Sequence, residues 1–185
     1  MPSLAPDGEE VAFLHSPRND GKYDIWITSV TKPNAEQVTN TSNVSDVAWS
    51  PTGDWLAYVQ NWSDETLEGQ LSLVRPNGDD PHIVVRSGDA PDWSPDGKKL
   101  VYVHNGSIWT VNSVGTGARL LVRDGHSPAW SRDGELIIFM RAEKCARSVC
   151  PEHVYLAFAD GSNPHELGPA YSDERRLAWL PDPYE

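Results

Sequence analysis

The chain has 185 residues, which is enough for one domain with a hydrophobic core but seldom enough for two domains. We therefore predict a single domain. Its 27 acidic and 15 basic residues give a formal net charge of −12, which repels the phosphate backbone of nucleic acids and anionic lipid headgroups alike. No apolar run approaches the roughly 20 residues that cross a bilayer, so we expect neither a nucleic-acid partner nor membrane insertion.

A short turn-forming phrase recurs along the chain. Its copies are Pro6-Asp7-Gly8, Pro51-Thr52-Gly53, Pro95-Asp96-Gly97 and Arg132-Asp133-Gly134, and Pro181-Asp182 begins a fifth. Proline fixes φ at the first corner of a turn, aspartate or threonine accepts local amide hydrogen bonds, and glycine takes the left-handed conformation that follows. The first four copies begin 45, 44 and 37 residues apart. A period of roughly 40 to 50 residues is typical of four-stranded propeller blades.

Each copy of the turn predicts four strands, two that flank it and two that follow. The strand after the turn is Val11–Phe13, Leu56–Tyr58, Leu100–Tyr102 or Ile137–Phe139. A third follows at Asp24–Ile27, Gln70–Leu73, Ser107–Thr110 and His153–Leu156, and a fourth at Glu36–Thr39, His82–Val85, Arg119–Val122 and His165–Leu167. These β-branched and aromatic runs are too short and too punctuated for helices, so we predict an all-β fold of four-stranded antiparallel units.

A large apolar side chain precedes the turn in every unit. Leu4 occupies this place in the first unit, and the later ones have Trp49, Trp93, Trp130 and Trp179. A small sheet cannot bury both faces alone, so successive sheets must stack, and we expect the indole rings to lie between neighbouring blades. The predicted blades span residues 1–43, 44–88, 89–124 and 125–173, and residues 174–185 supply the first strand of a fifth.

One stretch carries a family resemblance. The sequence Pro91-Asp92-Trp93-Ser94-Pro95-Asp96-Gly97, followed by Leu100-Val101-Tyr102 and Ile108-Trp109, resembles the repeat of TolB-type β-propellers, relatives of the WD-repeat proteins. The resemblance covers nearly the whole chain and implies an incomplete propeller, four blades plus one strand of a six-bladed ring. It also implies a bacterial periplasmic or secreted protein used for protein interaction. A cytoplasmic location stays open, because no signal segment follows Met1.

The candidate binding residues lie where the chain enters the inner strand of each blade. Asp46, Asp89, Asp92, Asp124 and His126 belong to these segments. Loops at one end of a rigid scaffold commonly carry recognition, and four carboxylates would suit a basic peptide or protein. Ordinary solvated surface is the alternative for any single aspartate. The sequence thus predicts a non-catalytic interaction module; the alternative is the propeller portion of a larger peptidase, lyase or sensor protein.

Two cysteines lie close together in the loop before the third strand of the fourth unit. Cys145 and Cys150 flank a short hydrophilic segment, which favours a local disulfide and an oxidising compartment. Two free thiols are the alternative. Zinc, with His153 nearby, would lack a fourth ligand and the usual paired spacing, so we expect no metal.

The segment Gly125-His126-Ser127-Pro128-Ala129 approaches the G-x-S-x-G nucleophile elbow. That motif works on a strand-to-helix turn with a base and an acid nearby, whereas this segment leads into an inner strand, so we interpret it as a linker between blades. No cofactor site and no catalytic constellation emerges, and we predict that the chain is not an enzyme. Exposed faces and strand edges on the terminal blades predict self-association.

Overall fold

The computed structural model describes residues 2–63, 68–143 and 151–170. Within these residues the chain forms strands and turns and no helix, so none of them provides a helix able to cross a membrane. The first sheet contains β1 (Ser3–Leu4), β2 (Glu10–His15), β3 (Asp24–Ser29) and β4 (Glu36–Gln37). The second contains β5 (Val44–Trp49), β6 (Leu56–Ser63), β7 (Glu68–Val74), β8 (His82–Trp93), β9 (Lys99–His104), β10 (Ser107–Asn112) and β11 (Arg119–Val122). The third contains β12 (His126–Trp130), β13 (Leu136–Ala142), β14 (Glu152–Phe158) and β15 (His165–Pro169).

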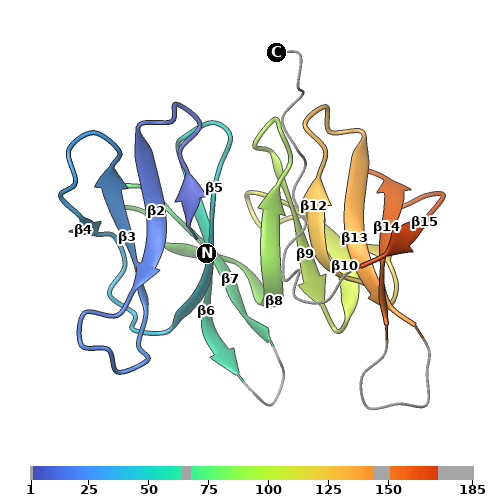
Figure 1. Cartoon of the computed structure of the whole chain (residues 1–185), viewed down its shortest axis with the longest axis horizontal. Coiled ribbons are helices and arrows are strands. Elements are labelled where there is room, and N and C mark those ends of the chain that lie inside the picture. The colour runs from blue at the N-terminus through green and yellow to red at the C-terminus, as the bar shows by residue number, and fades with distance from the viewer. Residues whose placement is uncertain (1, 64–67, 144–150, 171–185) are drawn as a thin grey trace.

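The middle sheet is two blades joined by one long strand. The first part of β8 pairs with β7, where Val85 lies opposite Leu71, and the second part pairs with β9, where Trp93 lies opposite Leu100. We name the four units blade 1 (β1–β4), blade 2 (β5–β7 and the first part of β8), blade 3 (the second part of β8 and β9–β11) and blade 4 (β12–β15). Blades 1 and 4 lie at opposite ends of the molecule in Figure 1. The predicted all-β fold, an incomplete propeller of four-stranded antiparallel blades, is confirmed.

Three hydrophobic clusters lie between consecutive blades. They contain Ala12, Ile25 and Trp49; Ala48, Leu73 and Trp93; and Val101, Ile108 and Trp130, each with further neighbours. The three indole rings belong to the first strands of blades 2, 3 and 4, and they are 8, 6 and 9% exposed. Burying a ring of about 150 to 250 Å² at about 25 cal/mol per Å² stabilises a junction by at most about 4 to 6 kcal/mol. The tryptophans therefore join each blade to the one before it.

The recurring turns close by the hydrogen bonds that their sequence predicts. In blade 3 the Gly97 N–H donates to the Ser94 carbonyl at 2.8 Å, and Gly97 has a φ of +68°. The Ser94 hydroxyl donates to Asp96 Oδ1 at 2.7 Å and accepts the Lys99 N–H at 2.9 Å. The turns also contact one another, because a Cβ built on Gly134 would lie 3.5 Å from Cδ of Pro95 in the preceding blade. Proline and glycine of the repeat thus serve the blade junction as well as the turn.

The outer hairpins make a second contact between blades. A Cβ built on Gly161, in the turn between β14 and β15, would lie 2.5 Å from the carbonyl oxygen of Leu121 in blade 3. Gly78 and Gly115 make the corresponding approaches to Val38 and Val84, at 3.1 and 3.3 Å. Only a residue without a side chain permits such an approach of two backbones.

The outer strand of blade 1 is shorter than predicted, because it ends at Gln37 rather than Thr39. The Asp24 side chain is buried at the start of β3, and its Oδ1 accepts the Thr39 hydroxyl at 3.0 Å and the Thr41 N–H at 2.8 Å. A buried carboxylate needs such donors. The chain therefore leaves the sheet after Gln37 and folds over Asp24.

Candidate functional site

The first strands of the blades run side by side and place the candidate carboxylates at one end. Strands β1, β5, β8 and β12 contact one another in that order. Asp46 and Asp89 are half-buried in β5 and β8, and Asp124 is exposed just before β12. The structure thus brings Asp46, Asp89 and Asp124 to the same end of three neighbouring strands. We call these three residues the acidic rim.

The backbone is irregular at this end of all three strands. The pairing register shifts between Val44 and Asp46, between Asp89 and Asp92, and between His126 and Ala129. Ala90 and Ser127 adopt positive φ angles of 47° and 51° at corresponding places. Such bulges bend a strand and redirect its side chains. The sequence indicates two of these bulges through Pro91 and Pro128, since proline within a sheet is confined to edges and bulges.

Asp92 contributes to a blade junction. Its Oδ2 accepts the backbone N–H of Trp130 at 2.8 Å, which links the first strand of blade 3 to that of blade 4. The Ser3 hydroxyl makes the corresponding bond to the Trp49 N–H at 2.9 Å, between blades 1 and 2. Because Asp92 holds two blades together, we leave it out of the acidic rim.

His126 lies between a serine and a glutamate. Its Nδ1 is 3.1 Å from Ser127 Oγ, and its Nε2 is 3.2 Å from Glu152 Oε1. This chain of contacts resembles a nucleophile with its base and acid, but Ser127 is only 9% exposed. In a nucleophile elbow the residue after the serine supplies an N–H to the oxyanion, and here that residue is Pro128, which has none. The contacts therefore do not form an elbow, and they fasten β12 to β14.

Blade 4 carries a charged cluster beside the rim that sequence analysis missed. The Arg141 guanidinium lies 4.6 Å from the Tyr155 ring centroid and donates from Nε to the Asp124 carbonyl at 2.8 Å. His153 lies between two glutamates, with Nδ1 2.6 Å from Glu166 Oε1 and Nε2 3.0 Å from Glu143 Oε1. These carboxylates, Glu166 foremost, raise the pKa of His153 above 6.5. The cluster depends on three strands meeting, so no local motif announces it.

Several predicted residues fall outside this picture. Cys145, Cys150 and Trp179 lie outside the described residues, as does the predicted first strand of a fifth blade. In the part of the chain that the structure describes, no group of three histidine, cysteine, aspartate or glutamate side chains is arranged to hold a metal ion.

Comparisons with known proteins place these features in a family. The family model of the TolB beta propeller domain matches residues 1–182. The uncharacterized protein YidR of Escherichia coli K12 is 30% identical over 108 residues, which is 56% of this chain and 25% of YidR. The Tol-Pal system protein TolB of Xylella fastidiosa M12 is 38% identical over 71 residues, which is 35% of this chain and 16% of that protein. The matched segments thus span a quarter or less of these curated relatives.

Solved structures share the fold at low sequence identity. TolB from Acinetobacter baumannii superposes with a TM-score of 0.75 at 19% identity, over 91% of this chain and 42% of that one. An oligogalacturonate lyase in complex with manganese gives 0.70 at 14% identity, over 91% and 52%. A prolyl endopeptidase gives 0.63 at 12% identity, over 92% and 29%. Enzymes and a TolB protein therefore share this scaffold, and the likeness alone does not assign an activity.

Proposed function

This chain belongs to the TolB β-propeller domain family, and on that premise we propose that it is a non-catalytic interaction module that binds a basic protein or peptide. The observation that carries the proposal is the acidic rim, in which three neighbouring blades present Asp46, Asp89 and Asp124 at one end. Rigid blades hold these carboxylates in fixed positions, and complementary charge steers and orients a partner. The formal net charge of −12 acts in the same direction at longer range.

The test is the affinity of a fluorescein-labelled lysine-rich decapeptide, measured by fluorescence anisotropy at physiological ionic strength. Asp46→Lys, Asp89→Lys and Asp124→Lys are combined in one variant. The control variant reverses Glu9, Asp54 and Glu135, which are exposed and directly follow the turn glycines at the opposite end of the sheets. We expect the rim variant to lose about tenfold or more in affinity and the control to lose much less. An equal loss in both variants would show an effect of net charge alone and would refute the rim.

We further propose a bacterial periplasmic location, in line with the resemblance to TolB propellers and with the bacterial relatives. An oxidising compartment would allow the disulfide between Cys145 and Cys150. Thiol titration of protein purified from the periplasm and denatured without reductant should then find no free thiol. Two free thiols per chain would contradict the disulfide.

Self-association is a second element of the proposal. Leu4 in blade 1 and Phe158 and Leu167 in blade 4 are 59, 49 and 56% exposed. Large exposed apolar side chains on the end blades favour contact with another copy. Light scattering should show dimers or larger species that dissociate on dilution. A monomer at all concentrations, with cooperative unfolding, would overturn this element.

A further inference from the structure

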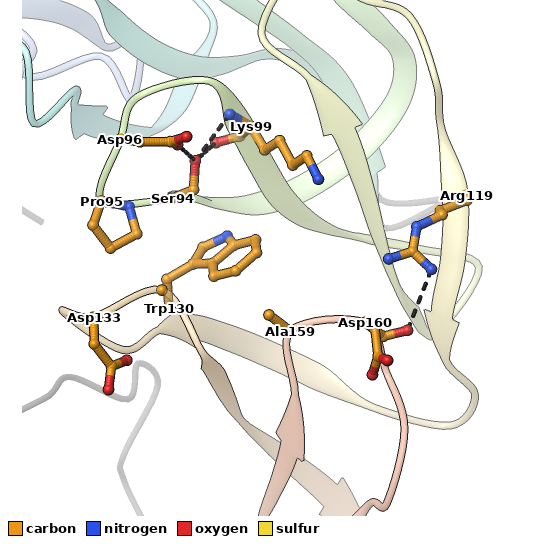
Figure 2. Close-up of a pocket in the computed structure, with 10 residues that line it drawn as sticks. Ser94, Pro95, Asp96, Lys99, Arg119, Trp130, Asp133, Ala159 and Asp160 are labelled. Carbon is orange, nitrogen blue, oxygen red and sulfur yellow. Dashed lines mark hydrogen bonds between the residues drawn. The ribbon is translucent and has the colours of Figure 1, made fainter.

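A cavity of about 450 Å³ opens between blades 3 and 4, at the end opposite the acidic rim. Its walls come from the recurring turns of both blades and from the outer hairpin of blade 4. Figure 2 shows the Trp130 ring lying between the blade 3 turn at Pro95 and the hairpin at Ala159. Lys99 and Arg119 reach from blade 3 over the space beside that ring, whereas the carboxylates of Asp133 and Asp160 are directed away from it.

The corresponding positions between blades 2 and 3 hold different residues. Trp55 corresponds to Lys99, because each residue donates its N–H to the hydroxyl of the turn serine five residues earlier. His82 corresponds to Arg119, because each begins the outer strand of its blade. The Trp55 ring packs on the core cluster that contains Trp93 and meets the His82 ring edge-on at 5.2 Å. Replacing this aromatic pair by Lys99 and Arg119 therefore opens the space and gives it two cations.

The cavity brings together N–H donors from blades 3 and 4. The Trp130 indole N–H is buried and, among the described residues, has no acceptor, while its counterpart on Trp93 donates to the Ala48 carbonyl at 3.1 Å. The Arg119 guanidinium donates from Nη1 to the Asp160 carbonyl at 3.2 Å. A buried donor without an acceptor destabilises the protein, and a ligand that brings an acceptor removes that penalty.

The carboxylates that line the cavity are already engaged within their own turns. Asp96 Oδ1 accepts the Ser94 hydroxyl, and Asp133 Oδ1 accepts the Ser131 hydroxyl at 2.5 Å. Asp160 Oδ1 accepts the Ser162 N–H at 2.8 Å. These hydrogen bonds, and for Asp160 above all the one from the Ser162 hydroxyl, hold the pKa of each aspartate below its usual value, so all three stay ionised and act as fixed parts of the turns.

We propose that this cavity binds a carboxylate group of an acidic partner segment, held by Lys99 and Arg119 with its acceptor oxygen directed toward the Trp130 indole. A guanidinium and an ammonium group form strong charge-assisted hydrogen bonds with carboxylates. The cavity is separate from the acidic rim, and Lys99 and Arg119 would bind the opposite charge there. One chain would thus bind a basic segment at one end of its blades and an acidic segment at the other.

The test follows the indole N–H resonances of ¹⁵N-labelled protein, whose eight tryptophans give one indole signal each. The probe is the peptide acetyl-Gly-Glu-Gly-Glu-amide, and the same peptide with glutamine in place of glutamate is the neutral control. Trp130→Phe identifies the Trp130 signal by its loss. We expect a saturable shift of that signal with the glutamate peptide and none with the glutamine peptide. Absence of a saturable shift would overturn the proposal.

Matched variants locate the binding. Lys99→Gln and Arg119→Gln each remove one exposed cation, and each should weaken binding about tenfold. Lys98→Gln removes the neighbouring charge, which does not line the cavity, and should leave binding nearly unchanged. Equal effects of Lys98→Gln and Lys99→Gln would contradict the site. Titration with succinate distinguishes a protein segment from a small free carboxylate as the ligand. Weaker binding of succinate than of the glutamate peptide supports a protein segment, and tighter binding of succinate refutes it. Affinity for the lysine-rich decapeptide should not change in Lys99→Gln, so the two proposals fail separately.

Discussion

Two junctions contain the same repeat residues but differ in their contacts. One joins blades 2 and 3, and the other joins blades 3 and 4. At the first, β8 runs unbroken from one blade into the next, Trp93 donates its indole N–H to Ala48, and the Trp55 ring covers the core. At the second, the chain leaves β11 before β12 begins, and the Trp130 indole N–H lacks an acceptor among the described residues. There Asp92 supplies the bond between first strands, to the Trp130 N–H.

The two junctions show that the repeat fixes how the blades stack, while a single residue change within the repeat can open a cavity. Turn, strand and tryptophan recur at both junctions, so both blades stack in the same way. The positions held by Trp55 and by Lys99 are equivalent, yet one closes its junction and the other lines a cavity. A binding site in such a cavity would need no change in the residues that pack one blade on the next.

The largest effect should come from the outer-hairpin glycines. Gly161→Ala places a Cβ 2.5 Å from the Leu121 carbonyl oxygen at a φ of +85°, and we expect a loss of about 2 to 4 kcal/mol in the free energy of unfolding. Gly115→Ala, with 3.3 Å to Val84, should lose less. Gly8→Ala has a φ of +75° and nothing within 4 Å, so it measures the backbone strain alone, about 1 kcal/mol. Urea denaturation followed by circular dichroism ranks the three variants, and an equal cost for Gly161→Ala and Gly8→Ala would show that the close approach to Leu121 does not matter.

The next effect tests whether the open junction can be closed. Lys99→Trp combined with Arg119→His gives blades 3 and 4 the residues that blades 2 and 3 have at Trp55 and His82. Filling a cavity commonly stabilises a protein by about 0.5 to 2 kcal/mol. We expect this gain in urea denaturation, together with loss of binding of the glutamate peptide. A destabilised variant that still binds the peptide would show that the two junctions are not equivalent.

A smaller difference should separate two otherwise identical substitutions. Trp93→Phe and Trp130→Phe remove the same atoms from equivalent positions, but within the described part of the chain only the first breaks an indole hydrogen bond, to Ala48. Trp93→Phe should therefore cost about 0.5 to 1.5 kcal/mol more than Trp130→Phe. Thermal unfolding of both variants measures the difference, and an equal cost would mean that the hydrogen bond does not contribute.

The smallest effect on stability concerns the third strands of the two end blades. Equivalent positions on these strands hold an acidic residue in blade 1 and a histidine in blade 4. Asp24 begins β3 and accepts hydrogen bonds, whereas His153, one residue into β14, lies between Glu143 and Glu166. Since the pKa of His153 is raised above 6.5, its contribution to stability is fully present below 6.5 and is lost as the pH rises through the raised value. His153→Gln should thus lower the melting temperature more at about pH 6 than at about pH 9. His165→Gln, on β15, is the control, and a pH-independent deficit in His153→Gln would contradict this account.

The strands and turns could be predicted because each depends on neighbours in sequence. The turn Ser94-Pro95-Asp96-Gly97 contains its own hydrogen-bond partners, and the period repeats it four times. Features formed by side chains from different strands or different blades were missed, since spacing along the chain does not show which side chains face each other. The junction bond of Asp92, the approach of Gly161 to Leu121 and the pairing of His153 with Glu166 all belong to this kind. The shortened β4 has the same cause, because the buried Asp24 draws Thr39 out of the sheet.

The most direct test of this account is the hydrogen exchange of the two indole N–H groups, measured by NMR on the unmodified protein. The junctions repeat one design, and among the described first-strand tryptophans Trp49, Trp93 and Trp130 only Trp130 lacks an acceptor for its indole N–H. The account predicts that the hydrogen-bonded Trp93 N–H exchanges about tenfold more slowly than that of Trp130, and that the glutamate peptide slows Trp130 alone. Equal exchange of the two groups, or faster exchange at Trp93, would contradict it.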